Sequence, residues 1–217
     1  MDKFKSSKNW YVAEYDFDHA SFDTDWRKGA ARFQNGLHLH LEPHKGGSNQ
    51  FSSGSIRRHE TTGYGRYSVT MQAAKGDGMV NGFFTYTGPY YGTVHDEIDI
   101  EILGKDPTKL QAGWFADGDH KNKLIDLGFD ASTCVHTYSF EWLPGGIRWY
   151  VGNQLIFSHD ADDGHIPHTA GHLFVNLWAA DRKISNWAGH ADPRATADMY
   201  VDTVTFTPLA DLPVPSS

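Results

Sequence analysis

Three acidic residues alternate with three isoleucines near the middle of the chain. The segment 95–104 reads HDEIDIEILG, so Glu97, Asp99 and Glu101 occupy every second position. On a β-strand, residues two apart point to the same side. A strand here would therefore place three carboxyl groups on one side and the isoleucines on the other, facing a core.

Carboxyl groups paired in this way suit the cleavage of a glycosidic bond. A retaining mechanism needs two carboxyls about 5–5.5 Å apart: one attacks the anomeric carbon and the other protonates the leaving oxygen. The Cα atoms of Glu97 and Glu101 would lie about 13 Å apart, and their long side chains and strand curvature can close that gap. Asp99 between them can hydrogen-bond one glutamate and separate the two pKa values. The competing interpretation is an exposed strand with a solvated face, in which like charges in a row would repel each other.

The elements around this segment follow the same period of two. Alternating apolar residues predict strands at 37–41, 67–71, 138–142 and 147–151. Turn signals separate them, and Gly152-Asn153 joins two apolar runs directly, which is typical of a tight hairpin. No stretch of 12 or more residues has a convincing helical stripe. We therefore predict an all-β fold, a sandwich of two antiparallel sheets.

Composition narrows the function classes. The 217 residues have a net charge of −8, which argues against a protein that binds the phosphate backbone of nucleic acids. Aromatic residues make up 14% of the chain, and their flat faces suit a polar, ring-shaped ligand. The single cysteine, Cys134, excludes a disulfide within the chain, and we interpret it as an ordinary unpaired thiol. No apolar run is long enough to span a membrane. We expect one domain over residues 1–217, with 213–217 as a frayed tail.

At the EIDIE segment the chain resembles glycoside hydrolase family 16, whose signature has the form E-[ILV]-D-[IFV]-x(0,1)-E. The gapless spacing is similar to that of bacterial lichenases, which are endo-β-1,3-1,4-glucanases, and of plant xyloglucan transglycosylases. Lichenase-like blocks extend the resemblance over about residues 20–207: FFTYTGP at 83–89, LGKD at 103–106, DLGFDAS at 126–132, HTY at 136–138 and NLW at 176–178. The resemblance implies a β-jelly roll with a concave substrate cleft, and retaining, endo-acting cleavage of a β-linked polysaccharide by double displacement.

The resemblance also implies roles for individual residues. Glu97 would be the nucleophile, Asp99 its helper and Glu101 the general acid/base. Five further positions match those that line the family's cleft: Arg57, Tyr86, Asn176, Trp178 and Trp187. We place Trp114 at the cleft as well, and assign Trp142 and Trp149 to the core.

Several positions depart from the lichenase pattern. His95 stands where lichenases usually have Trp, which is similar to the transglycosylase form HDEIDFEFLG and to rhizobial glycanases that process exopolysaccharide. Ser55 replaces a cleft Glu, while Gly113 and Phe115 replace an Asn and a Tyr. We count His95 and Phe115 among the substrate-binding residues. The expected substrate is a β-1,3-1,4-glucan or a related, substituted β-glucan or exopolysaccharide. The departures argue against strict lichenan specificity, and Gly113 would open space for a bulkier or substituted backbone.

Two alternatives stay open. One is a transglycosylase on the same scaffold, in which a sugar hydroxyl replaces water. The other is a non-catalytic jelly-roll lectin, which would have no need of a nucleophile.

For cofactors and partners we expect a polysaccharide substrate, no cofactor in catalysis, no nucleic acid, no membrane and a monomer. The resemblance implies a structural calcium ion near the Asn35-Gly36 turn, at Gly36 and Asp202. The histidine pairs 38/40 and 165/168 lack a carboxylate at catalytic-zinc spacing, so we interpret them as surface histidines. The start of the chain lacks the apolar stretch of a signal peptide, which leaves the cytosol open, but the expectation is a secreted protein.

Overall fold

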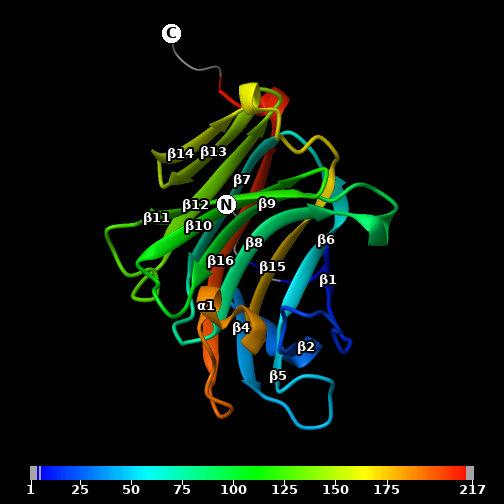
Figure 1. Cartoon of the computed structure of the whole chain (residues 1–217), viewed down its shortest axis with the longest axis vertical. Coiled ribbons are helices and arrows are strands. Elements are labelled where there is room, and N and C mark those ends of the chain that lie inside the picture. Colours follow the sequence, from blue (N-terminus) through cyan, green and yellow to red (C-terminus); the bar gives the residue numbers. More distant parts are fainter. Residues whose placement is uncertain (1–3, 5, 214–217) are drawn as a thin grey trace.

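Two β-sheets packed face to face form the molecule, and the computed structural model describes residue 4 and residues 6–213. The seven-stranded sheet has the order β1 (Trp10–Val12), β6 (Ser55–Thr62), β15 (Gly171–Ala179), β8 (Met79–Thr87), β9 (Asp96–Leu103), β10 (Lys109–Ala116) and β11 (Asp119–Asp126). In Figure 1, β8, β9 and β10 cross the front of the molecule. All adjacent strands in this sheet pair antiparallel.

The nine-stranded sheet lies behind the first (Figure 1). Its order is β14 (Gln154–Asp160), β13 (Gly146–Val151), β12 (His136–Leu143), β7 (Gly65–Gln72), β16 (Ala197–Pro208), β4 (Leu37–Pro43), β5 (Phe51–Ser53) and β2 (Thr24–Trp26), with β3 (Ala31–Phe33) paired to β4. One pair, β2 with β5, is parallel. The predicted all-β jelly roll of two antiparallel sheets is confirmed.

Helical segments are short and lie in the connections. They are η1 (Lys28–Ala30), η2 (Pro89–Tyr91), η3 (Ala161–Asp163), η4 (Arg182–Ile184), α1 (Ser185–Ala188) and η5 (Leu209–Asp211). Within the described part of the chain, no helix has the length and apolar character needed to cross a membrane. Except for Pro213, the tail predicted to be frayed lies outside the described residues.

Strand periodicity places the core between the two sheets. Ile98, Ile100 and Ile102 of β9 are fully buried, as the alternation predicts. From the other sheet, Trp142 and Trp149 are buried too, which confirms their assignment to the core. The core therefore holds the strand of the three carboxyl groups by its apolar side.

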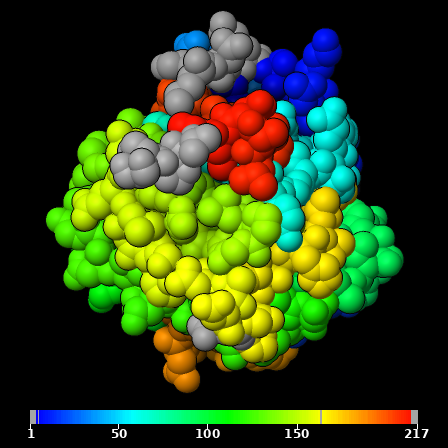
Figure 2. Space-filling view, turned by 90° about the horizontal axis from the view of Figure 1, so that it is seen from above, coloured from blue at the N-terminus to red at the C-terminus, as the bar shows by residue number. Residues whose placement is uncertain are grey.

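The space-filling view shows how distant parts of the chain close one end of the sandwich. In Figure 2, the red end of the chain lies beside the cyan segment that follows β6. The N–H of Leu209 donates to the carbonyl of Tyr64 there, at 3.1 Å. The end of the last strand is thus tied to the turn between β6 and β7.

An indole hydrogen bond joins the two sheets beneath β9. The Nε1–H of Trp149 donates to the backbone oxygen of Asp99 at 3.0 Å, and both groups are buried. Since an unsatisfied buried polar group costs about 1–3 kcal/mol, this bond helps to hold the middle of β9 in place.

Trp149→Phe should therefore lower the free energy of unfolding by about 1–3 kcal/mol and also reduce kcat. Trp142→Phe is the matched control, because that indole is equally buried but donates to Pro167, on a connection. Urea denaturation and steady-state rates measure both effects. Equal losses of kcat in the two variants would contradict the link between Trp149 and the carboxyl-bearing strand.

Candidate active site

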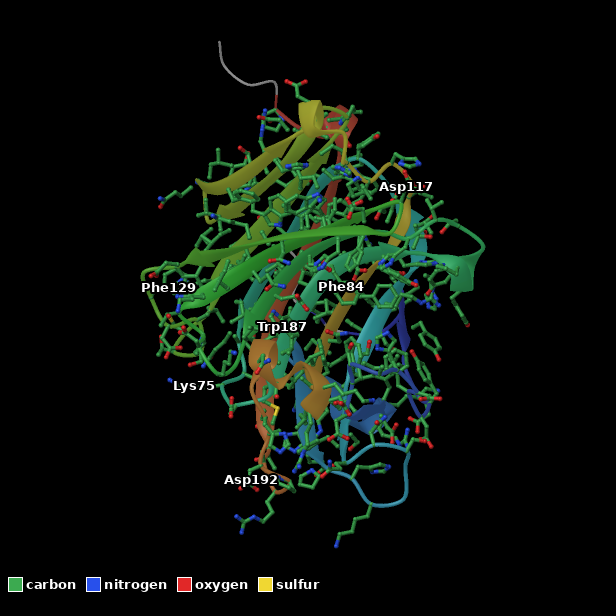
Figure 3. The ribbon with its side chains drawn as sticks, in the orientation of Figure 1. Lys75, Phe84, Asp117, Phe129, Trp187 and Asp192 are labelled. Carbon is green, nitrogen blue, oxygen red and sulfur yellow. The ribbon has the colours of Figure 1, made fainter. Side chains whose placement is uncertain are left out.

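A cleft runs across the face of the seven-stranded sheet that points away from the core. Its floor comes from residues of all seven strands of that sheet. Its rim comes from the segment before β2 and from the connections that carry η2 and η4. Figure 3 labels two of its side chains, Phe84 on β8 and Trp187 beside the strands. The aromatic lining residues are Tyr11, Tyr15, Phe17, Phe22, Trp26, Phe84, Tyr86, Tyr90, Tyr91, Phe115, Phe174, Trp178 and Trp187.

Glu97, Asp99 and Glu101 lie together on the floor of this cleft, as the alternation predicts. Strand pairing surrounds each of them with known neighbours. Glu97 lies opposite Tyr86 and Phe115. Asp99 lies opposite Phe84 and Gly113, and Glu101 lies opposite Gly82 and Gln111.

Two glycines make room for polar side chains on the floor of the cleft, one for the Asp99 carboxyl group and one for the Asn176 amide. A Cβ atom at position 113 would lie 2.8 Å from Oδ2 of Asp99, and one at position 82 would lie 2.4 Å from Oδ1 of Asn176. Both distances are too short for a carbon atom. The space beside Gly113 is therefore filled by the Asp99 carboxyl group.

Burial changes the protonation of all three acids. It raises the pKa of Glu101 to about 8; Asp99 acts in the same direction, and a hydrogen bond from Gln111 opposes it. Burial likewise raises the pKa of Glu97 to about 8; a hydrogen bond with Asp99 opposes this rise, and the Glu101 charge adds to it. The pKa of Asp99 is raised well above its usual value by burial and by Glu97. The group therefore retains protons at neutral pH, and Asp99 is suited to donate one to Glu97.

A relay of two hydrogen bonds orients Glu101. The Nε2–H of Gln111 donates to Oε2 of Glu101 at 3.1 Å. The indole Nε1–H of Trp187 donates to Oε1 of Gln111 at 2.8 Å, which fixes which end of the amide faces the acid. Trp187 was predicted at the cleft, whereas Gln111 was missed because only strand pairing brings it opposite Glu101.

Arg57 lies farther along the cleft between aromatic rings. Its guanidinium carbon is 5.3 Å from the ring centre of Tyr11 and 5.8 Å from that of Tyr91. Its Nη1 lies 3.1 Å from Nε2 of His172. A cation packed against aromatic rings in this way can offer N–H donors to a sugar.

Asn176 and Trp178 line the cleft on β15, as predicted. Oδ1 of Asn176 is buried and has no hydrogen-bond partner among the described residues, so it can accept from a ligand hydroxyl. Trp178 is almost fully buried and stacks on Phe22 with ring centres 4.0 Å apart. Its indole supports the wall of the cleft and lies 6.0 Å from that of Trp187.

The prediction that Trp114 contacts substrate is wrong. Its side chain points into the core, where its ring centre lies 5.5 Å from that of Trp149. Because β10 alternates, Gly113 and Phe115 face the cleft and Trp114 must face the other way. The same alternation on the neighbouring strands exposes aromatic residues that sequence reasoning missed, namely Tyr11, Phe84 and Phe174.

One group of described side chains brings three ligand atoms close enough to share a metal ion: Asp96, Asp117 and His168. The oxygens of Asp96 already accept the backbone N–H groups of Asp117, His168 and Thr169 at 2.8–2.9 Å. These bonds fasten two loops to the start of β9 and account for the cluster without an ion.

The predicted calcium residues do lie near each other. Tyr200 places its hydroxyl 2.9 Å from the carbonyl oxygen of Asn35 and 2.8 Å from Oδ1 of Asp202. The carbonyl of Gly36 accepts the N–H of Gln34. The oxygens at this place are thus engaged in hydrogen bonds within the chain.

An aromatic cleft with three carboxyl groups on the concave sheet of a jelly roll defines a class, the carbohydrate-active enzymes of this fold. The family model for glycosyl hydrolases family 16 matches residues 18–200. The chain belongs to this family and is a glycosidase.

Curated relatives agree over most of the chain. A Paenibacillus polymyxa protein named beta-glucanase is 42% identical over 203 residues, 93% of this chain and 84% of that protein. The beta-glucanase of Bacillus subtilis (strain 168) is 39% identical over 91% of this chain and 81% of its own length.

Solved structures agree as well. A beta-1,3-1,4-glucanase (lichenase) from a mouse hindgut metagenome superimposes with a TM-score of 0.90 at 33% identity, covering 96% of this chain and 98% of that one. A Bacillus licheniformis beta-glucanase gives a TM-score of 0.86 at 36% identity, covering 94% and 96%. A transglycosylase, Crh5, is 20% identical with a TM-score of 0.78 and shares the fold.

The raised pKa of Asp99 predicts a stability effect that depends on pH. A carboxyl group whose pKa is higher in the folded than in the unfolded protein does not destabilise the fold below the unfolded pKa, which is about 4. It lowers the free energy of unfolding progressively as the pH rises toward the folded pKa. Asp99→Asn should therefore raise Tm at pH 7 and leave it nearly unchanged at pH 4, by about 2–4 °C for each kcal/mol relieved. Thermal unfolding at both pH values measures this, with the exposed Asp211→Asn as control. A gain of equal size at both pH values would contradict it.

Proposed function

We propose that the protein is a retaining, endo-acting glycoside hydrolase that cleaves a β-linked glucan by double displacement. The observation that carries this proposal is the row of Glu97, Asp99 and Glu101 on the floor of an open cleft, in an environment that keeps part of the group protonated. An open cleft along a sheet suits the internal bonds of a long chain. The beta-glucanase relatives support the substrate class.

The roles follow from the surroundings of each acid. Glu97 has a hydrogen bond with Asp99, which lowers its pKa against the effect of burial, and it lies beside Nε2 of His95, so we assign it as the nucleophile. Burial raises the pKa of Glu101 to about 8, and a hydrogen bond from Gln111 orients its carboxyl group, so Glu101 would protonate the leaving oxygen and then deprotonate the incoming water. Asp99 would hold the proton that positions Glu97.

The two glutamates should respond differently to substitution. Glu97→Gln should abolish turnover in a folded protein, since the covalent path is lost. Glu101→Ala should still form a glycosyl-enzyme from an activated aryl glycoside, because that leaving group needs no proton. Added azide should then restore turnover and yield a β-glycosyl azide. An α-azide, or rescue of Glu97→Gln in place of Glu101→Ala, would overturn the assignment.

Substrate preference is proposed from the departures at positions 55 and 95. Ser55 lies on the cleft wall where a charged acceptor would grip sugar hydroxyls, and hydrogen bonds to charged groups contribute about 1.5–3 kcal/mol. His95 offers a smaller, polar ring than Trp. Gly113 adds nothing to this argument, because Asp99 fills the space beside it. We propose that a substituted β-glucan or exopolysaccharide is accepted at least as well as plain mixed-linkage glucan.

A substrate panel tests this preference. We expect kcat/KM on decorated β-glucans to equal or exceed that on plain mixed-linkage glucan. Ser55→Glu should raise kcat/KM on the plain glucan by about tenfold or more. A wild-type enzyme far more efficient on the plain glucan, with no gain in Ser55→Glu, would count against the proposal.

Transglycosylation is the second candidate, and His95 in place of Trp is the feature that favours it. Reducing-end release from glucan in water distinguishes hydrolysis from transfer to added oligosaccharide. Binding without any cleavage would instead support the lectin alternative.

A structural calcium ion at Gly36 and Asp202 stays a prediction from the family resemblance. If it binds, excess calcium should raise Tm over that in EDTA, and Asp202→Ala should lose the response. An unchanged Tm in the wild-type protein would contradict calcium binding, and the hydrogen bonds of Tyr200 would then be what connects Asn35 and Asp202.

We further propose a single catalytic domain over residues 1–217 that works as an extracellular monomer on polysaccharide. Two sheets that share one main core support the single domain. Extracellular action fits a polymer too large to enter a cell.

A further inference from the structure

His95 makes a close polar contact with Glu97. Its Nε2 lies 2.5 Å from Oε2 of the glutamate, and both side chains are partly exposed to the cleft. The two residues stand at positions i and i+2 of the chain, so they share the cleft face of the sheet. The imidazole is thus next to the group that we assign as the nucleophile.

Aromatic packing holds the imidazole in this orientation. Its face stacks on Phe115 with ring centres 4.1 Å apart and planes 15° apart. Phe115 stacks in turn on His120 at 4.3 Å and 13°. The ring of Tyr86 packs edge-on against His95 from β8, at 5.3 Å. With a ring on one face and another at its edge, His95 has little freedom to turn away from Glu97.

The groups around His95 favour a neutral ring, which can donate from Nε2 when Glu97 is ionised. Burial lowers its pKa, and the neighbouring Asp96 acts in the opposite direction. Glu97, Tyr86 and His120 face it from β9, β8 and β11. A neutral imidazole beside a carboxylate donates its Nε2–H, and hydrogen bonds to ionised acceptors are about twice as strong as neutral ones.

This hydrogen bond acts in opposite directions on the two chemical steps. When Glu97 attacks the anomeric carbon, its negative charge is consumed and the bond from His95 weakens. In the second step, the oxygen of water bonds to the anomeric carbon while the bond from that carbon to Glu97 breaks. The electron pair returns to the Glu97 carboxylate, the water proton passes to Glu101, and the bond from His95 strengthens.

We propose that His95 is a positioning residue that speeds breakdown of the glycosyl-enzyme by stabilising the departing Glu97 carboxylate through its Nε2–H. This inference rests on the proposed role of Glu97. It assigns to position 95 a function that a phenyl ring cannot supply, because a phenyl ring has no hydrogen-bond donor.

Two variants separate the hydrogen bond from the ring. His95→Phe keeps an aromatic ring to stack on Phe115 and lacks the donor, whereas His95→Gln retains an N–H donor at a similar reach. The probe is a 2,4-dinitrophenyl β-glycoside of a mixed-linkage glucan trisaccharide, followed by stopped-flow absorbance and by intact-mass analysis of quenched enzyme. Circular dichroism confirms that each variant is folded.

For His95→Phe we expect a burst of dinitrophenol at a rate equal to or above wild type, then steady turnover about 10–100-fold slower. Glycosyl-enzyme should accumulate, and His95→Gln should recover most of the steady rate. Equal slowing of both phases, or a glutamine variant no better than phenylalanine, would overturn the inference and leave the glycosidase proposal intact. An active Glu97→Gln enzyme would instead overturn the proposed function.

Discussion

Three carboxyl groups confined to one face of one strand are the constraint on which the structure of this protein depends. Glu97, Asp99 and Glu101 cannot all carry a charge at close range in a partly dry cleft, so burial and mutual repulsion raise their pKa values. The fold tolerates this because the opposite face of β9 is secured by three buried isoleucines and by the indole of Trp149. Such a site lowers the folding stability of the protein, but it provides groups that can exchange protons near neutral pH.

Neighbouring strands adjust each carboxyl individually. Glu97 has a hydrogen bond with Asp99, which lowers its pKa, and contacts His95, whereas Glu101 accepts one amide hydrogen bond from Gln111. Burial still raises the pKa of both glutamates to about 8. Gly113 leaves the space that the Asp99 carboxyl needs. Residues across the sheet therefore give identical side chains on one strand different hydrogen-bond partners.

The sequence predicted the fold class and the three carboxyl groups because both depend on a local period of two. It failed where a position depends on which strand lies alongside. Gln111 and Phe84 could not be placed before the pairing of β9 with β10 and β8 was known. Trp114 was misplaced because its aromatic type was given more weight than the alternation of its own strand, which sends it into the core.

The central claim is that Glu97 becomes covalently bonded to the sugar. Incubation with a 2-deoxy-2-fluoro-β-glycoside carrying a good leaving group should trap that intermediate, since the fluorine slows its hydrolysis. Proteolysis and mass spectrometry of the trapped enzyme should then locate the sugar on Glu97. A sugar on Glu101, or the absence of any adduct while the reagent is turned over with inversion, would contradict the account.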